Sequence, residues 1–184
     1  MKNPFLIGAQ VYLRPLERED APLFVPWVND AAVTRTLAMF YRPINLQAEM
    51  DFIERIYKSE HDVVLGIAVK DTDVLIGITG LHQLDFKNRC AVFGIFIGEK
   101  NEWGKGYGTE ATALMADYAF ATLNLNRVEL QVYEDNERGI KAYESVGFKR
   151  EGVLRQKMYR EGCYWNVLIM SILREEWDVR KRPG

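Results

Sequence analysis

The sequence is poor in the residues that build metal and redox sites. Its 184 residues include only two cysteines and two histidines. Neither Cys90 nor Cys163 has a partner at a metal-binding or redox spacing, so we expect no metal site. Both cysteines lie in apolar, strand-like runs, which predicts buried free thiols of the kind found in a reducing cytoplasm.

Long apolar runs and an excess of charge of one sign are also lacking. No run of 18 or more apolar residues occurs, which predicts no membrane span, and residues 1–4 do not open a secretory signal. The 24 basic and 26 acidic residues form neither a basic stripe for nucleic acid nor an acidic tail. With 48% hydrophobic residues, the chain suits one globular domain over residues 1–184, and we expect it in the cytoplasm.

Glycine, in contrast, is concentrated in one turn. Residues 92–111 read as an apolar run, then Trp-Gly-Lys-Gly-Tyr-Gly over residues 103–108, then the start of a helix near Thr109. Glycine lets a ligand approach the backbone closely, and the unpaired N–H groups of a helix start attract anions. Together these features predict a phosphate cradle.

Two known phosphate cradles serve as comparisons. The P-loop spacing Gly-x-x-x-x-Gly-Lys-Ser/Thr is absent. The dinucleotide fingerprint is matched by Gly106, Gly108 and Ala111, with Glu129 as a candidate ribose ligand. That fold requires repeated βαβ units with the glycine turn in the first of them, whereas three strand-like runs joined by short polar connections precede the turn here. The order of elements therefore disfavours a dinucleotide site.

Apolar periodicity predicts a mixed α/β fold. The expected strands are 10–15, 63–69, 74–82, 90–98, 128–133, 148–158 and 163–173, and the expected helices are about 20–28, 32–38, 46–58, 109–123, 136–146 and 174–180. Short polar connections make the strands of residues 63–98 antiparallel, and only the strands flanking the 109–123 helix need be parallel. The 109–123 helix is expected to bury Ala111, Leu114, Met115, Tyr118 and Thr122. The N-terminal helices, with Trp27, Phe40 and Tyr41 near their breaks, are expected to form one wall of a cleft.

Two segments in the second half resemble a known family. Residues 92–111, followed by Val-Glu-Leu-Gln-Val-Tyr-Glu-Asp-Asn over 128–136 and Ala-Tyr-Glu-Ser-Val-Gly-Phe over 142–148, resemble the GNAT family of acyl-CoA-dependent N-acetyltransferases. Residues 13–17, 27–30 and 168–173 are similar to its branch of ribosomal-protein N-terminal acetyltransferases and spermidine N-acetyltransferase. The resemblance covers nearly the whole chain. It implies a mostly antiparallel central sheet, splayed at the acyl-CoA site and flanked by helices.

The resemblance also implies acetyl-CoA as donor, an amine as acceptor, and a set of CoA-binding residues. The main chain of the glycine turn would bind the CoA pyrophosphate, and the preceding strand would meet the pantetheine arm. The implied CoA-binding residues are Phe96, Ile97, Gly98, Trp103, Gly104, Lys105, Gly106, Tyr107, Gly108, Thr109 and Asn136. The family pattern has Gln or Arg where this chain has Trp103, a departure that main-chain binding tolerates. A homodimer or higher homo-oligomer stays open.

The same resemblance implies that Tyr143 is the general acid. A phenol with a pKa of ~10 stays protonated at neutral pH and can donate to a thiolate whose conjugate acid has a pKa of about 8.5. The spacing of Tyr143 from Ile140 and Val146 equally fits a plain core residue.

A general base is less evident from the sequence. Gln131 stands where many relatives carry a glutamate, and glutamine cannot accept a proton. Val92 stands where polyamine enzymes commonly carry an acidic residue. Glu129, His82 and Asp85 remain as candidates. The predicted acceptor-binding residues are Trp27, His82 and Gln131.

The missing carboxylates bear on the acceptor. An amine with a pKa of ~10.4 is only roughly a thousandth neutral at pH 7.4, whereas an α-amine with a pKa of ~7.7–8.0 is substantially neutral already. We therefore expect the acceptor to be the N-terminal α-amine of a peptide or protein, or a small-molecule amine of low pKa. Polyamine acetylation and a non-catalytic acyl-CoA-binding protein are the alternatives.

Overall fold

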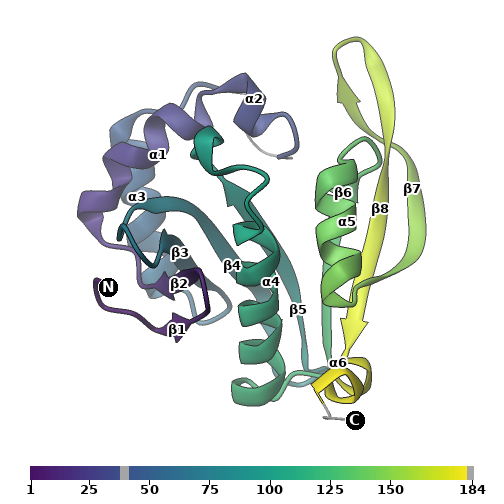
Figure 1. The fold of residues 1–184 in the computed structure, drawn as a ribbon. Helices are drawn as coiled ribbons and strands as arrows, with labels where there is room; N and C mark the ends of the chain where they lie inside the picture. The colour runs from purple at the N-terminus through teal and green to yellow at the C-terminus, as the bar shows by residue number, and fades with distance from the viewer. Residues whose placement is uncertain (38–41, 182–184) are drawn as a thin grey trace.

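The computed structural model describes residues 1–37 and 42–181 and shows an eight-stranded mixed sheet in the order β1-β2-β3-β4-β5-β6-β8-β7 (Figure 1). The strands are β1 (Leu6–Ile7), β2 (Val11–Arg14), β3 (Val63–Val69), β4 (Leu75–Asp85), β5 (Cys90–Ile97), β6 (Arg127–Tyr133), β7 (Lys149–Arg160) and β8 (Cys163–Leu173). The α-helices are α1 (Ala21–Val28), α2 (Ala31–Thr34), α3 (Leu46–Lys58), α4 (Tyr107–Asp117), α5 (Glu137–Val146) and α6 (Arg174–Lys181), and the short helices are η1 (Arg18–Asp20), η2 (Lys100–Glu102) and η3 (Tyr118–Thr122). Phe40 and Tyr41 lie outside the described residues.

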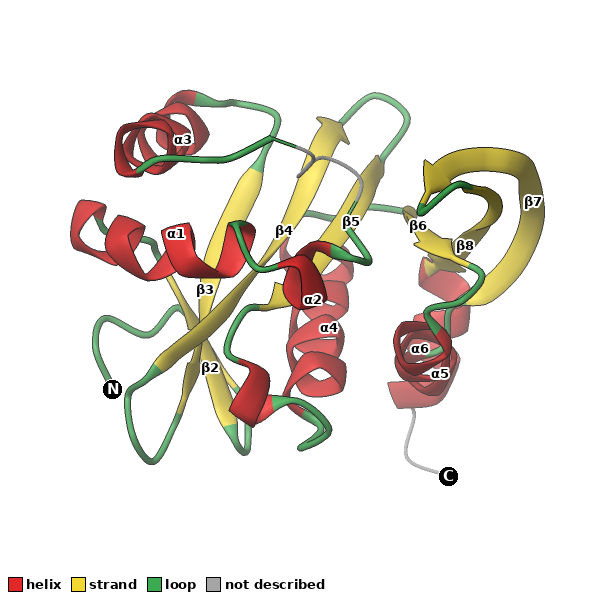
Figure 2. Ribbon diagram, turned by 90° about the horizontal axis from the view of Figure 1, so that it is seen from above, coloured by secondary structure: helices red, strands yellow, loops and turns green. Residues whose placement is uncertain are grey.

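The helices cover both faces of the sheet. Helices α1 and α3 lie on one face of β2–β5 and α4 lies on the other (Figure 2). The larger core packs α4 and α5 against the sheet and includes Phe93, Met115 and Val128. The smaller core, with Phe24 and Ile53, packs α1 and α3 against the opposite face. None of the helices within the described residues has both the length and the apolar character needed to cross a membrane.

Local capping sets the helix ends where the sequence predicts them. Asn45 precedes α3, and its Oδ1 accepts the amide of Ala48 at 2.9 Å. Gly147 ends α5 with a φ of 117°, in the left-handed region that glycine adopts without strain. The bounds of α3 and β3 match the prediction, because Asn45 caps the start of α3 and β3 is a continuous apolar run followed by a polar turn.

The sheet opens in its middle. Strands β5 and β6 are parallel and are paired at only three positions, which end at Val92 opposite Glu129. Beyond this point β5 stays paired with β4 as far as Ile97, and β6 stays paired with β8 as far as Tyr133. The two strands therefore diverge from the end near α6, as Figure 1 shows. This divergence is the splay that the family resemblance implies.

Helix α4 differs from its prediction in start and phase. It begins at Tyr107, two residues earlier than expected, and continues after Asp117 as the π-helical turn η3. A π turn holds more residues than an α turn, so the inward face rotates along the sequence. The predicted inner residue Thr122 is exposed, Leu114 and Tyr118 are half-buried, and Ala119 and Phe120 are buried in their place.

The expectation of two buried thiols was wrong. Cys163 is exposed and Cys90 is half-buried. Cys163 is the first residue of β8 after the turn of the β7–β8 hairpin, and this hairpin projects beyond the rest of the sheet (Figure 1). An apolar run in such a hairpin has no helix to cover it, so its strand-like pattern does not imply burial.

A buried ion pair joins β2 to the first helical segment. Arg14 Nη1 and Nη2 donate to the carboxylate of Asp20 at 2.7 and 2.8 Å, and both side chains are almost fully buried. Desolvation favours the neutral acid, but the hydrogen bonds from Arg14 and from the amide of Glu17 outweigh it and hold the pKa of Asp20 below its usual value. The pair fixes the path of the chain from the sheet into α1.

Replacing Arg14 by methionine should lower the free energy of unfolding by about 3–5 kcal/mol, because Asp20 would remain as an unpaired buried charge. Urea unfolding measures this loss. Arg18→Met is the matched control, because Arg18 and its partner Glu54 are both largely exposed and such a pair contributes less than about 1 kcal/mol. Equal losses in the two variants would contradict the prediction.

Candidate functional site

A cavity of about 740 Å³ lies between the outer half of β5, the turn before α4, the start of α5 and the end of α2. Ten of the residues predicted from the family resemblance line it: Phe96, Ile97, Trp103, Gly104, Gly106, Tyr107, Gly108, Thr109, Asn136 and Tyr143. Gly98, Lys105, Trp27, His82 and Gln131 are not part of its lining. The structure thus brings together residues from two segments that are about 30 positions apart in the sequence.

The glycine turn presents main-chain N–H groups to open space. Gly104 and Gly106 have φ values of 79° and 87°, and Gly106 is the N-cap of α4. Within the described residues, the amides of residues 104–109 meet no acceptor, and the first amide bonded inside α4 is that of Glu110. A Cβ on Gly104 would have no atom within 4 Å. These amides, at the positive end of a helix, form a site suited to a phosphate group.

Trp103 connects the two sides of the cavity. Its indole Nε1 donates to the carbonyl of Ile97 at 2.8 Å, which ties the turn to the end of β5. The guanidinium of Arg138, on α5, lies 4.5 Å from the centre of the indole ring. Trp103, which stands where the family pattern has Gln or Arg, therefore acts as a packing residue and leaves the amides of the turn exposed.

The open edge of β5 offers main-chain groups to the cavity. The amide of Gly98 donates to the carbonyl of Ile76 in β4, and the carbonyl of Gly94 accepts from the hydroxyl of Thr79, so even-numbered residues here direct their main chain toward β4. Odd-numbered residues direct theirs to the open side, because successive residues of a strand alternate. Ile95 therefore joins Ile97 at the open edge. Ile95 was not among the residues expected from the sequence, although this alternation combined with the implied splay predicts it.

Asn136 both caps α5 and lines the cavity. Its Oδ1 accepts the amide of Gly139 at 3.0 Å. Its Nδ2 meets no acceptor within the described residues, which leaves a donor for a ligand at the start of the helix.

Tyr143 combines a packed ring with a hydroxyl that is not bonded to the protein. The half-buried ring meets Phe93 edge-on, with 6.2 Å between ring centres, and lies 6.0 Å from Phe148. Burial raises the pKa of Tyr143 to about 12, so the phenol holds its proton throughout the physiological range. No described residue hydrogen-bonds to its hydroxyl, and the residue lines the cavity. The packed ring therefore fits the interpretation of Tyr143 as a core residue, and the unbonded hydroxyl fits its interpretation as a general acid.

Two of the predicted residues pack against each other instead of lining the cavity. The indole of Trp27 is buried in the smaller core. A Cβ on Gly98 would lie 2.1 Å from Cδ2 of Trp27, so the absence of a side chain at Gly98 makes room for the indole. Lys105 is exposed, and its ammonium pairs with Glu102 at 2.9 Å.

The three base candidates have different surroundings. His82 Nδ1 lies 2.8 Å from Oδ1 of Asp62. Asp85 accepts the amide and the Nδ2 of Asn88, both at 2.7 Å, within the β4–β5 turn. Glu129 belongs to an ion-pair cluster on the face of β6 that also carries the exposed Gln131.

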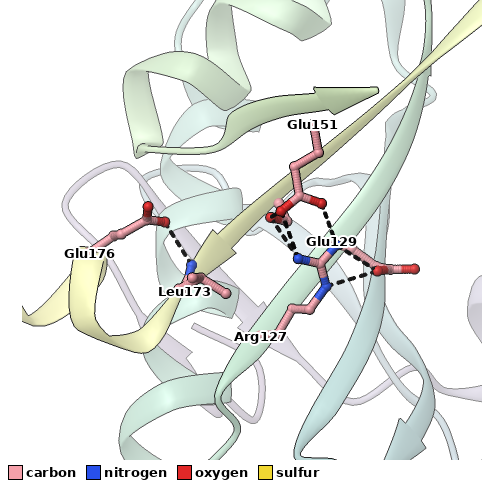
Figure 3. Close-up of polar contacts among 6 residues, drawn as sticks. Arg127, Glu129, Glu151, Leu173 and Glu176 are labelled. Carbon is pink, nitrogen blue, oxygen red and sulfur yellow. Dashed lines mark hydrogen bonds and ion pairs between the residues drawn. The ribbon is translucent and has the colours of Figure 1, made fainter. Parts of the chain in front are cut away.

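Arg127 is the centre of this cluster (Figure 3). Its Nε and Nη2 donate to Glu129 at 3.0 and 2.9 Å, and its guanidinium also holds both oxygens of Glu151. The hydrogen bonds from Arg127 and Ser171 lower the pKa of Glu151 to about 2. Glu129 is thus fixed by a cation and is not free to move toward the opening of the sheet.

Every acidic residue that lines the cavity is paired with a cation. These pairs are Glu102 with Lys105, Asp135 with Arg35 and Arg160, and Glu137 with Lys141. Across the described parts of the chain, no three or more His, Cys, Asp or Glu side chains are grouped to hold a metal ion.

Comparisons with known proteins agree with this geometry. The family described as "Acetyltransferase (GNAT) domain" matches residues 10–149. The chain is 34% identical over 176 residues to the spermidine N(1)-acetyltransferase of Escherichia coli (strain K12), covering 95% of this chain and 92% of that protein. It is 37% identical over 107 residues to the putative ribosomal N-acetyltransferase YdaF of Bacillus subtilis (strain 168), covering 58% of each. The crystal structure of the spermidine N-acetyltransferase from Vibrio cholerae in complex with CoA and spermine is similar with a TM-score of 0.84 and 26% identity, covering 92% of this chain and 99% of that one.

Proposed function

Because this chain belongs to the GNAT family of acetyl-CoA-dependent N-acetyltransferases, we propose that it acetylates an amine of low pKa, either the N-terminal α-amine of a peptide or protein or a small-molecule amine. The observation that carries this choice is that each carboxylate on the cavity wall is already paired with a cation. A polyamine carries several positive charges and needs free carboxylates to bind it, whereas an α-amine that is substantially neutral does not.

Polyamine acetylation is the second candidate. It is favoured by the similarity to proteins named spermidine acetyltransferases. Against it stand Val92 and Gln131, which are uncharged on the face of the sheet where the acceptor would approach.

The donor would lie along the open edge of β5. The amides of residues 104–109 would hold the CoA pyrophosphate, and Ile95, Ile97 and the Nδ2 of Asn136 would bond to the pantetheine arm. The thioester would then lie beside Tyr143. The amine nitrogen forms a bond to the acetyl carbon and loses one proton, the C–S bond breaks, and the hydroxyl of Tyr143 gives a proton to the leaving sulfur.

Thiol release measured with acetyl-CoA and a panel of amines tests the proposed acceptor class. Two sets of lysine-containing peptides are compared, one with a free α-amine and one with the α-amine blocked, so that only the lysine side chain can react. The first set should give the higher kcat/KM, because only the α-amine is substantially neutral at pH 7.4. Spermidine, spermine and aminosugars complete the panel. A kcat/KM for spermidine above that of every α-amine would favour the polyamine alternative.

Replacing Gly104 by alanine should weaken CoA binding by about tenfold or more, because the methyl group would enter the space in front of the amides. Gly162→Ala is the matched control. Gly162 has a φ of 82°, and a Cβ on Gly162, like one on Gly104, would have no atom within 4 Å. Both variants therefore carry a similar backbone strain of about 1–2 kcal/mol. Titration calorimetry with CoA compares them, and equal affinities would place the phosphate site elsewhere.

Tyr143→Phe should lower kcat by about 10²–10⁴-fold, the usual contribution of a positioned acid, and should leave CoA binding nearly unchanged. Single-turnover acetyl transfer at saturating amine is the decisive measurement. Tyr118→Phe is the control, because burial also raises the pKa of Tyr118 but this residue lies outside the cavity lining. A Tyr143→Phe rate within about threefold of the parent would rule out the acid role.

A further inference from the structure

A row of side chains crosses the sheet at the last position where β5 and β6 are paired. His82 of β4 is opposite Val92 of β5, which is opposite Glu129 of β6. Residues directly opposite each other on neighbouring strands project from the same face. This is the face on which α1 and α3 pack, since Phe93 belongs to the core under α4 and its neighbour Val92 points the other way. His82 and Glu129 thus flank the apex of the opening.

The imidazole of His82 is oriented by a second residue. Asp62, which precedes β3, lies 2.8 Å from Nδ1 of His82 and accepts the hydroxyl of Ser59 at 2.6 Å. Desolvation favours the neutral acid, but the hydrogen bonds from Ser59 and His82 hold the pKa of Asp62 below its usual value. Because an ionised carboxylate only accepts hydrogen bonds, Nδ1 donates to Asp62, and in the neutral imidazole this leaves Nε2 as the acceptor.

Two glycines place Nε2 next to the opening. Gly80 and Gly94 are opposite each other on β4 and β5. A Cβ on Gly80 would lie 3.0 Å from Nε2 of His82, and a Cβ on Gly94 would lie 3.5 Å from it. Gly94 is the first residue beyond Val92 on this face of the sheet, so it has no partner on β6. The imidazole therefore lies over bare main chain at the inner end of the opening, with 38% of its side chain exposed.

The other candidates are less suited to accept a proton here. Glu129 is held by two hydrogen bonds from Arg127, which keep its carboxylate on the guanidinium. Both carboxylate oxygens of Asp85 accept hydrogen bonds from Asn88 within the β4–β5 turn. Gln131, on the far side of the opening, has no basic atom.

We propose that His82 is the general base of the acetyl transfer and that Asp62 is its positioning residue. Nε2 of His82 accepts one proton from the amine as the N–C bond forms, and Asp62 stabilises the resulting imidazolium. The hydroxyl of Tyr143, whose ring packs against Phe93 on the opposite face, gives its proton to the sulfur as the C–S bond breaks. One proton leaves nitrogen and one reaches sulfur, and both side chains return to their starting forms by exchange with water. This assignment rests on the proposed function.

His82→Ala should lower kcat by about 10²–10⁴-fold with the best acceptor found, without weakening the thermal stabilisation by CoA. His82→Gln, which keeps more of the side-chain volume, should show the same loss, and Asp62→Asn should show a loss of about tenfold. Added imidazole should restore part of the rate of His82→Ala, an effect that a merely structural role would not produce. His61→Ala is the matched control, because His61 is the other histidine of the chain and is exposed.

The loss should also depend on the acceptor. For amines of graded pKa, the ratio of parent to His82→Ala rates should grow as the amine becomes more basic, because a basic amine relies more on proton removal. Rates of both His82 variants within threefold of the parent, or a loss that imidazole does not restore and that Glu129→Gln reproduces, would overturn the assignment. Absence of thiol release by the parent with every amine would refute the proposed function itself.

Discussion

The site depends on the end of pairing between β5 and β6 after Val92 and Glu129. A fully paired sheet would satisfy the main-chain groups of β5 on both sides, and there would be no room for a ligand. Where pairing stops, the main-chain groups of Ile95 and the amide of Ile97 need partners, while the carbonyl of Ile97 already accepts from Trp103. The amides of a pantetheine arm can supply such partners, so the donor would take the place of a missing strand.

Polar contacts across the rim fix the two halves of the opened sheet relative to each other. Arg138 of α5 lies over Trp103 of the turn before α4. On the α2 side of the cavity, Asp135 pairs with Arg35 and with Arg160, and Arg160 also donates to the carbonyl of Arg35 at 2.6 Å. These contacts join the segment after α2 to the β7–β8 hairpin, 125 residues further along the chain. Because the same contacts neutralise the carboxylates near the cavity, they also bear on which amines can bind there.

Much of the fold follows from local patterns, while the interior contacts do not. The N-cap and periodicity of α3 and the apolar run of β3 lie in consecutive residues, so their bounds were predictable. The glycine pattern and the helix start predict a candidate anion site, and the relation of that turn to acetyl-CoA came from the family resemblance. The rotation of the buried face after Asp117 depends on a π turn that no sequence pattern marks. The packing of Trp27 into the space left by Gly98 depends on tertiary contacts, which turned a predicted acceptor contact into a core residue.

The pKa of Tyr143 constrains how it can act as an acid. A donor with a pKa of about 12 gives its proton only uphill to a thiolate whose conjugate acid has a pKa of about 8.5 in water. The environment that raises the pKa of the phenol also destabilises a thiolate formed beside it, which brings the two affinities for a proton closer together. A base on the opposite face, as proposed for His82, would remove the amine proton without placing its positive charge next to the sulfur. In the proposed mechanism, the opening in the sheet would separate the two proton transfers onto its two faces.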